Sequence, residues 1–575
     1  MNKLAISHRS TDHYAYACAN NEIHIMLKAE KNDLKKVQIV YGDPYDMPAG
    51  KWSIQKVEMN KTGSDRYFDY WQTVVKPPYR RLRYGFELDD GEDKLFFGEG
   101  GFSHKRPDDI AFYFAMPFVH ASDAFQPPHW VKETVWYQIF PERFANGNKK
   151  NDPASVLKWG SRDPEAHHFF GGDLQGVIDQ IDYLKELGIT GIYFTPIFKA
   201  FSNHKYDTID YLEIDPQFGD NETLKNLIAV CHRNGIKVML DAVFNHSGFY
   251  FPQFQDVLEK GEDSPYKNWF HIREFPVVTE PMPSYDTFAF TPFMPKLNTQ
   301  NEEVRRYLLN VARYWVEEFD IDGWRLDVAN EVDHQFWRDF RRVVKEVKPD
   351  LYILGEIWHD AMPWLRGDQF DAVMNYPFTR NILDLFAKGT ITPKDFIENM
   401  TSVIHMYPST VNTSAFNLVG SHDTPRVLNE CSGNSDKVRQ IFTFLLTFIG
   451  TPCIYYGDEI GLDGGHDPGC RKCMVWEKSK QDQDMFNHVQ KLIRLRKEYP
   501  LLGNEGRLSF LPVQSNCFAF MKEDNDQKIL VVFNVSDQLE PYTLPAPAVV
   551  DLWTGKELRS NEVKIAGQGF AILKY

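Results

Sequence analysis

The pattern of apolar and polar positions changes its period about 130 residues into the chain. Before that point apolar residues alternate with polar ones, first at Ile23, Ile25 and Leu27 and then over residues 82–88. A period of two is typical of a strand with one buried face. The second run enters an Asp-Asp-Gly sequence and then resumes, which predicts a hairpin. We therefore expect residues 1–125 to form a small β-sandwich.

After residue 131 short apolar segments alternate with longer segments of helical period. Helices are expected at 174–187, 221–234, 302–319 and 336–347. Strands are expected at 135–140, 189–196, 236–241, 323–327, 352–356, 370–375, 416–420 and 453–456. Eight strands mostly separated by helices predict an α/β fold, a (β/α)8 barrel of the TIM type.

Two other segments interrupt or follow this alternation. Residues 247–298 are rich in proline and aromatic side chains and are too many for an ordinary connection after the third strand. We expect them to form a small inserted domain that divides the barrel into 126–246 and 299–502. From 503 to 575 the chain returns to strand patterns, which predicts a C-terminal β domain.

Composition and charge exclude several classes of protein. Of the 575 residues, 43% are hydrophobic and 25% are charged, which is ordinary for a soluble globular chain. The 64 basic and 80 acidic residues give a net charge of −16, so we expect neither a nucleic acid nor a membrane as partner. There is no secretion signal or apolar run long enough to span a membrane. Seven cysteines, an odd number, favour a reduced, cytoplasmic setting, and the lone pair Cys470 and Cys473 favours loop packing over zinc.

Four acidic residues stand where predicted barrel strands end. Asp241 ends the third strand, Asp327 the fourth, Glu356 the fifth and Asp423 the seventh. The carboxyl ends of barrel strands converge on the active site, so these side chains should meet. Gathering like charges in a partly desolvated cleft opposes stability, which points to chemistry. Glycoside cleavage uses such a set, with one carboxylate as nucleophile and one carboxylic acid as proton donor.

Five sequence motifs carry a resemblance to a known family. DAVFNH at 241–246, GWRLDVANE at 323–331, GEIW at 355–358 and GSHD at 420–423 resemble the conserved regions of the α-amylase superfamily, glycoside hydrolase family 13. MPKLN at 294–298 resembles an additional motif of its neopullulanase, cyclomaltodextrinase and maltogenic amylase branch. The resemblance covers nearly the whole chain, including the N-terminal β domain.

The resemblance implies a catalytic role for each of three acidic residues. Asp327 is the expected nucleophile, Glu356 the general acid and base, and Asp423 the stabiliser of the transition state. Arg325 lies two residues before Asp327, and so on the same face of its strand, where it would hold the nucleophile ionised. Asp241 is expected to support the site by hydrogen bonds rather than to do chemistry.

The resemblance also implies the residues that bind the substrate. His246, Arg325 and His422 are expected around the sugar that is cleaved, with Tyr206 as the aromatic platform beneath it. Asp467 and Arg471 resemble a pair that holds the donor-side glucose units.

On the acceptor side, Trp358 is expected to stack on a sugar ring. Asn330 and Glu331 replace the residues that ordinary α-amylases carry there, so they should shape acceptor binding. For Glu331 a solvated surface position is the alternative.

A structural Ca²⁺ site is implied near the start of the barrel. The expected ligands are Asn146, Asn148, Asn151, Asp152, Gly171 and Asp173. Hard oxygen ligands suit Ca²⁺, and a backbone carbonyl of either Gly171 or Gly172 would be one of them. The alternative is an Asn/Gly turn without metal.

The expected function is therefore a retaining hydrolase of α-1,4-glucosidic bonds. The substrates would be pullulan, cut to panose, together with cyclomaltodextrins and malto-oligosaccharides, with some transglycosylation. The alternatives are a 4-α-glucan transferase and a non-catalytic amylase-like binding protein. A metallohydrolase is a third class, but the sequence lacks an HExxH or similar ligand spacing.

The resemblance gives the N-terminal β domain a role in assembly. In the related branch this domain packs against a partner subunit and walls its active site, so we expect a two-fold homodimer. The alternative is an independent starch-binding module on a monomer.

Overall fold

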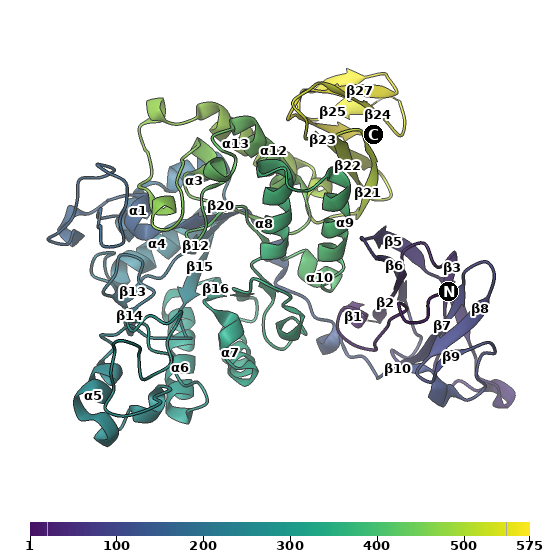
Figure 1. Cartoon of the computed structure of the whole chain (residues 1–575), viewed down its shortest axis with the longest axis horizontal. Coiled ribbons are helices and arrows are strands. Elements are labelled where there is room, and N and C mark those ends of the chain that lie inside the picture. The colour runs from purple at the N-terminus through teal and green to yellow at the C-terminus, as the bar shows by residue number, and fades with distance from the viewer. Residues whose placement is uncertain (20, 548) are drawn as a thin grey trace.

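An eight-stranded parallel barrel forms the centre of the molecule (Figure 1). The computed structural model describes residues 1–19, 21–547 and 549–575. The sheet order is β18-β17-β16-β15-β12-β11-β20-β19, and a parallel bridge between Met374 and Phe416 joins its two edges. The strands are β11 (Trp136–Ile139), β12 (Gly191–Phe194), β15 (Lys237–Ala242), β16 (Gly323–Leu326), β17 (Tyr352–Gly355), β18 (Ala372–Val373), β19 (Phe416–Asn417) and β20 (Thr451–Tyr455). The predicted (β/α)8 barrel is confirmed.

Two barrel strands are shorter than their apolar segments suggest. β18 and β19 have two residues each, although strands were expected at 370–375 and 416–420. The reason lies in the residues that follow them. Asn375 already caps the next helix, since its side chain accepts a hydrogen bond from the Phe378 N–H. After β19 the chain turns at Ser421, whose carbonyl accepts from the Thr424 N–H.

Helices cover the outside of the barrel and begin where the sequence supplies a cap. Asp220, Asn301 and Asp333 each accept a hydrogen bond from the first turn of the helix that follows. The predicted helix at 174–187 is two helices that meet at Gln180. The main helices are α2 (Leu174–Asp179), α3 (Ile181–Leu187), α4 (Asn221–Arg233), α6 (Glu302–Phe319), α7 (His334–Val347), α8 (Tyr376–Ile382), α9 (Pro393–Ile404), α12 (Ser435–Thr447) and α13 (Gln483–Glu498).

The N-terminal domain is a β-sandwich of two sheets, as expected. One sheet has the order β1-β2-β6-β5, and the other has the order β4-β3-β7-β8-β9 with β10 against β7. The strands are β1 (Ala15–Ala19), β2 (Glu22–Glu30), β3 (Lys36–Gly42), β4 (Gln55–Glu58), β5 (Asn60–Ser64), β6 (Phe68–Val75), β7 (Leu82–Asp89), β8 (Lys94–Gly98), β9 (Gly101–Ser103) and β10 (Phe114–Met116).

Strand β2 is buried on both faces, although its alternating pattern is typical of a half-buried strand. His24 and Met26, on the face opposite Ile23 and Ile25, are also buried. They line a small cavity together with His405, which follows helix α9 of the barrel domain. The second face is therefore covered by the neighbouring domain, a contact that a local pattern does not encode.

The inserted segment and the C-terminal domain complete the chain. Residues 247–298 contain helix α5 (Pro252–Lys260), and they return to the barrel through an antiparallel bridge between His246 and Lys296. The C-terminal domain has a main sheet of order β21-β22-β23-β28-β25-β26 and a β24-β27 pair. Its strands are β21 (Arg507–Gln514), β22 (Cys517–Glu523), β23 (Lys528–Asn534), β24 (Glu540–Thr543), β25 (Val549–Asp551), β26 (Lys556–Leu558), β27 (Glu562–Ile565) and β28 (Phe570–Lys574). Over the described parts of the chain, no helix combines the length and apolarity needed to cross a membrane.

Candidate active site

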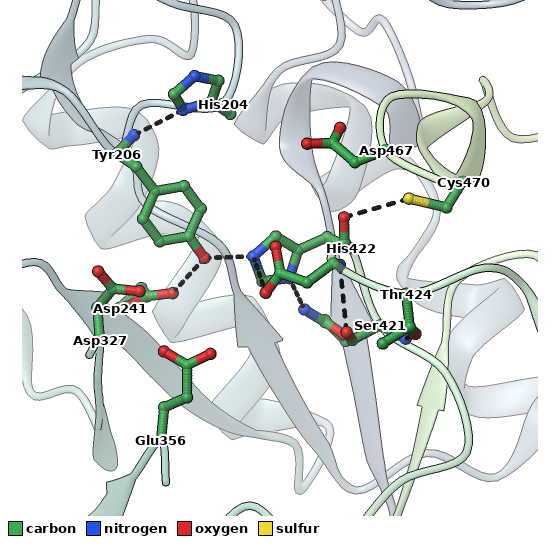
Figure 2. Close-up of polar contacts among 12 residues, drawn as sticks. His204, Tyr206, Asp241, Asp327, Glu356, Ser421, His422, Thr424, Asp467 and Cys470 are labelled. Atoms are coloured by element: carbon green, nitrogen blue, oxygen red, sulfur yellow. Dashed lines mark hydrogen bonds and ion pairs between the residues drawn. The ribbon is translucent and has the colours of Figure 1, made fainter. Parts of the chain in front are cut away.

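Three carboxylates surround one buried arginine at the carboxyl ends of β15, β16 and β17. Nη1 of Arg325 lies 2.9 and 3.0 Å from the two carboxylate oxygens of Asp241 and 2.6 Å from Oδ1 of Asp327. Its Nη2 lies 2.9 Å from Oε2 of Glu356. Figure 2 shows these carboxylates side by side. Arg325 has no exposed surface and lies beneath the acids, so it does not line the cavity as the expected sugar contact would.

The backbone of the barrel explains why these side chains meet at one level. The parallel ladder continues one residue beyond the strand ends. The Asp327 N–H donates to the carbonyl of Ala242 at 3.1 Å, and the Glu356 N–H donates to the carbonyl of Leu326 at 3.0 Å. Each acid is thus held by the strand before it, in the register that the barrel imposes.

Burial has the largest influence on the pKa values of the acids in the site. It raises the pKa of Asp241 to about 6 and also raises the pKa values of Asp327 and Asp423. Attraction to Arg325 opposes the shift at all three, and Arg471 opposes it at Asp423. Together with Glu356, the site has four carboxyl groups against the two guanidiniums of Arg325 and Arg471. A cluster of this kind retains a proton near neutral pH, which supplies one carboxylic acid beside a carboxylate.

His422 and Tyr206 form a hydrogen-bonded chain that ends on Asp241 (Figure 2). Nε2 of His422 lies 2.6 Å from the Tyr206 hydroxyl and 3.2 Å from Oδ2 of Asp423. The Tyr206 hydroxyl donates to Asp241 at 2.9 Å, and the two rings are parallel with centroids 5.3 Å apart. Burial lowers the pKa of His422 well below its usual value, so the ring is neutral.

Gln138 of β11 is a site residue that the sequence interpretation missed. Its Nε2 donates to Nδ1 of His422 at 2.7 Å, and its side chain is buried. With Nδ1 accepting, a neutral His422 carries its hydrogen on Nε2, the atom that faces Tyr206 and Asp423. The available signal was a polar residue within the apolar strand at 135–140.

His246 presents a buried nitrogen without a partner in the described structure. Its Nε2 has no hydrogen-bond partner, and burial lowers its pKa to about 3, so the ring is neutral. A buried polar atom of this kind is usually satisfied by a ligand or water. Phe288 of the inserted segment stacks on the ring with centroids 5.2 Å apart. Phe288 was also missed, because nothing in its local sequence marks it.

The site contains one cavity of about 650 Å³, a size typical of ligand sites. Every predicted catalytic and sugar-binding residue except Arg325 lines it. Arg471 lies 2.9 Å from Asp467 and 3.4 Å from Asp423, and its Nε donates to the His422 carbonyl at 2.8 Å. The predicted donor-side pair is therefore tied to the loop that carries Asp423.

The lining of the cavity also includes Asn330, Glu331 and Trp358. Trp358 is half exposed and stacks on Tyr376 with centroids 3.5 Å apart and an angle of 8°. Nζ of Lys296, in the motif at 294–298, lies 3.1 Å from the Glu331 carbonyl and 3.4 Å from its carboxylate. Glu331 is thus anchored to the inserted segment.

The predicted calcium ligands also lie together, in the loop between β11 and α2. Nδ2 of Asn146 donates to Oδ1 of Asp152 at 2.7 Å, while the buried Oδ1 of Asn146 has no partner in the described structure. Asp173 accepts from the Asn148 N–H at 2.9 Å and from Nδ2 of Asn151 at 3.4 Å. A Cβ built on Gly171 would lie 2.4 Å from Oδ1 of Asp152, so the backbone closely approaches that carboxylate. An unpartnered amide oxygen beside two carboxylates fits a hard cation.

Comparisons with known proteins agree with this geometry. Residues 138–505 match the family model described as alpha amylase, catalytic domain, and residues 1–120 match alpha amylase, N-terminal ig-like domain. The chain is 61% identical to a maltogenic alpha-amylase of Bacillus acidopullulyticus, with all of both chains covered. It is 45% identical to neopullulanase 2 of Thermoactinomyces vulgaris, over 97% of this chain and 96% of that one. A solved structure of a cyclomaltodextrinase superposes with a TM-score of 0.96 and 48% identity over both whole chains.

Proposed function

The chain belongs to the α-amylase family of glycoside hydrolases, and on that basis we propose that it cleaves α-1,4-glucosidic bonds with retention of configuration. The proposed substrates are cyclomaltodextrins, pullulan, which would be cut to panose, and malto-oligosaccharides. One observation carries the proposal. Asp327 contacts Nη1 and Glu356 contacts Nη2 of the same buried Arg325, and both acids line one cavity.

The proposed reaction has two steps. In the first, a carboxylate oxygen of Asp327 bonds to the anomeric carbon while Glu356 gives its proton to the departing glycosidic oxygen. In the second, Glu356 takes a proton from water, whose oxygen displaces Asp327 and restores the carboxylate. Asp423 and His422 face the same space and would bind sugar hydroxyls more strongly as the ring distorts.

Transfer of the glycosyl unit to a second sugar uses the same residues. A sugar hydroxyl replaces water in the second step, so we propose some transglycosylation. Trp358 and the anchored Glu331 provide an acceptor side on which that sugar would bind.

We propose that the loop between β11 and α2 holds a structural Ca²⁺. The protein oxygens that would ligate it belong to Asn146, Asn148, Asn151, Asp152, Gly171 and Asp173. The ion would crosslink this loop to the first turn of α2, which Asp173 caps. Its contribution would be to stability, since no acid that lines the cavity belongs to the set.

We also propose a homodimer in a cytoplasmic setting. Three large aromatic side chains of the N-terminal domain are exposed, with 77% of Tyr45, 64% of Tyr67 and 59% of Tyr79 accessible. Exposed aromatic residues on a β-sandwich suit an interface. The seven cysteines are free thiols, which suits a reducing compartment.

The test of the substrate proposal is product chromatography on β-cyclodextrin, pullulan and soluble starch, run side by side. We expect cyclodextrin to be opened and hydrolysed, pullulan to give panose, and starch to react more slowly. Products longer than the substrate as the main outcome would instead identify a transferase.

A further inference from the structure

The backbone immediately after the proposed nucleophile has a conformation that its side chain disfavours. Val328 has φ 45° and ψ 42°, in the left-handed region. A β-branched residue rarely adopts this region, because its Cβ meets the backbone there. Such outliers persist only where the surrounding structure imposes them, and they cluster at functional sites.

The turn at Val328 orients the peptide group between Asp327 and Val328. The N–H of that peptide donates to Oε2 of Glu356 at 3.0 Å. The same oxygen lies 2.9 Å from Nη2 of Arg325. Oε2 therefore accepts one backbone hydrogen bond and lies beside a guanidinium, and neither group can accept a proton from it.

The other carboxyl oxygen of Glu356 has a different environment. Among the residues that the structure describes, Oε1 has one hydrogen-bond partner, the Trp358 indole N–H at a long 3.4 Å. Glu356, Trp358 and Val328 all line the cavity. A proton on Glu356 is therefore stable on Oε1 and unstable on Oε2, where it would meet a backbone N–H and a cationic guanidinium.

We propose that the left-handed turn at Val328 is a positioning device for the general acid. It directs the Val328 N–H at Oε2, which also lies beside the guanidinium of Arg325, and leaves Oε1 to carry the proton that is transferred. This inference rests on the proposed function of Glu356. In the first step the Oε1–H bond breaks, the proton goes to the glycosidic oxygen as its bond to the anomeric carbon breaks, and Asp327 forms the new bond.

Val328→Gly tests this role, because glycine has no Cβ and adopts left-handed and right-handed backbone conformations about equally well. The 327–328 peptide can then rotate, so the donor to Oε2 becomes mobile. Two substrates that deliver the same maltosyl unit separate proton donation from nucleophilic attack. Maltotriose needs a proton on its leaving oxygen, whereas α-maltosyl fluoride needs little acid assistance.

We expect the ratio of kcat/KM for α-maltosyl fluoride to kcat/KM for maltotriose to rise at least tenfold in Val328→Gly. Losing a fixed donor to Oε2 destabilises the carboxylate form, so the alkaline limb of the kcat/KM profile for maltotriose should move to higher pH. The melting temperature should not fall, since the strain that is relieved offsets the greater chain entropy of glycine.

Two variants control for other effects. Val328→Ala removes the same methyl groups but keeps a Cβ, so the fluoride-to-maltotriose ratio and the pH profile should stay as in the unaltered enzyme. Ser515→Gly replaces another left-handed residue, with φ 54°, in the turn between β21 and β22, and should change neither kinetic measure.

Two results would overturn the inference. One is an equal loss on both substrates in Val328→Gly, which would show that the turn serves Asp327. The other is the same ratio and pH profile in the glycine and alanine variants. Failure of the underlying assignment is visible separately, because Glu356→Gln would then hydrolyse maltotriose as fast as the unaltered enzyme.

Discussion

Arg325 lies on β16 and Asp327 directly follows that strand, two residues later, with Nη1 of the arginine 2.6 Å from Oδ1 of the aspartate. Residues two apart on a strand point to the same face, so the spacing alone directs both side chains into the barrel mouth. Arg325 has no exposed surface, and a buried guanidinium needs carboxylates around it. Asp241 and Glu356 are the other two carboxylates around it, so the arginine holds the two acids proposed for the chemistry beside the supporting Asp241.

Asp327→Asn should lower turnover of maltotriose by a factor on the order of 10⁴ or more, because an amide does not form the glycosyl ester. The fold should persist, since Arg325 keeps Asp241 and Glu356 as partners. Initial rates and circular dichroism of the purified variant measure the two effects. Glu356→Gln serves as the companion variant and should keep more of its activity on α-maltosyl fluoride than on maltotriose. Unaltered hydrolysis of maltotriose by Asp327→Asn would falsify the assignment.

The stereochemistry of the product tests the pairing of Asp327 with Glu356. A nucleophile and an acid about 5–5.5 Å apart give retention, whereas a wider pair admits water and gives inversion. We expect proton NMR of freshly released maltose to show the α-anomer first, followed by slow mutarotation. If the β-anomer came first, Asp327 would act as a base rather than as a nucleophile.

The junction between the N-terminal domain and the barrel should weaken in acid. His405 stacks on Tyr70 with centroids 4.2 Å apart, and its Nε2 lies 2.9 Å from the Thr62 hydroxyl. Burial lowers the pKa of His405 to about 4, and that of the neighbouring His24 also to about 4. The unfolded chain therefore binds these protons between pH 6.5 and 4 while the folded chain does not, so stability falls as pH falls through that window.

His405→Gln removes one of these two titrating groups, so the stability of the variant should fall less between pH 7 and pH 5. At about 1.4 kcal/mol per pKa unit, a histidine with this shift costs about 2 kcal/mol of stability by pH 5. Melting temperatures at pH 7 and pH 5 measure the difference between the variant and the unaltered protein. His104→Gln changes an exposed histidine, with 76% of its side chain accessible, and should leave the pH dependence as it is. Equal pH dependence in His405→Gln and the unaltered protein would contradict the argument.

The barrel could be predicted because its signal is local. Apolar strands such as 236–241 and amphipathic helices such as 302–319 can be identified from the period of their apolar residues alone. The alternating order of strands and helices then indicates the barrel architecture. The burial of both faces of β2 could not be predicted, since it depends on a contact with helix α9, far away in the sequence.

The same distinction separates the site residues that were predicted from those that were missed. Asp327 and Glu356 follow directly from strands, so their positions could be deduced. Gln138 acts on His422 only because the barrel closes with β11, β20 and β19 side by side, which brings the first and seventh strands near each other. The left-handed backbone at Val328 is imposed by its surroundings against its own preference.

Removing Ca²⁺ should destabilise the protein, because an ion that binds only the folded state raises its stability. We expect a chelator to lower the melting temperature by several degrees. Asp173→Ala tests the site poorly, since Asp173 also caps α2 and accepts from the Gly147 N–H. Asn146→Ala combined with Asp152→Asn removes oxygen ligands with fewer structural contacts.

The double variant should lose bound calcium, measured by elemental analysis, and its melting temperature should no longer respond to the chelator. Glu165→Ala is the control, because Glu165 belongs to a separate, largely exposed group with His167 and His168. It should keep its calcium and its response to chelator. Unchanged calcium content in the double variant would place the ion elsewhere.

Deletion of residues 1–123 tests whether the N-terminal domain forms a wall of the partner's active site. A wall contributed by a partner narrows the cleft, so compact cyclodextrins would enter while bulky starch chains are hindered. An independent binding module would instead raise the local starch concentration and favour the polymer. On the dimer proposal, the truncated protein should be a monomer with a lower ratio of cyclodextrin to starch activity.

The truncation also uncovers the barrel surface beside His405, so its solubility and melting must be compared with those of a point variant. Tyr45→Arg combined with Tyr79→Arg places charge on two exposed aromatic positions without removing the domain. If these residues lie in the interface, light scattering should show a monomer, because an unpaired buried charge opposes association. Its activity ratio should then shift in the same direction as that of the truncated protein. A full-length chain that is monomeric in solution, or a truncation that loses only starch activity, would favour the binding-module alternative and exclude the dimer.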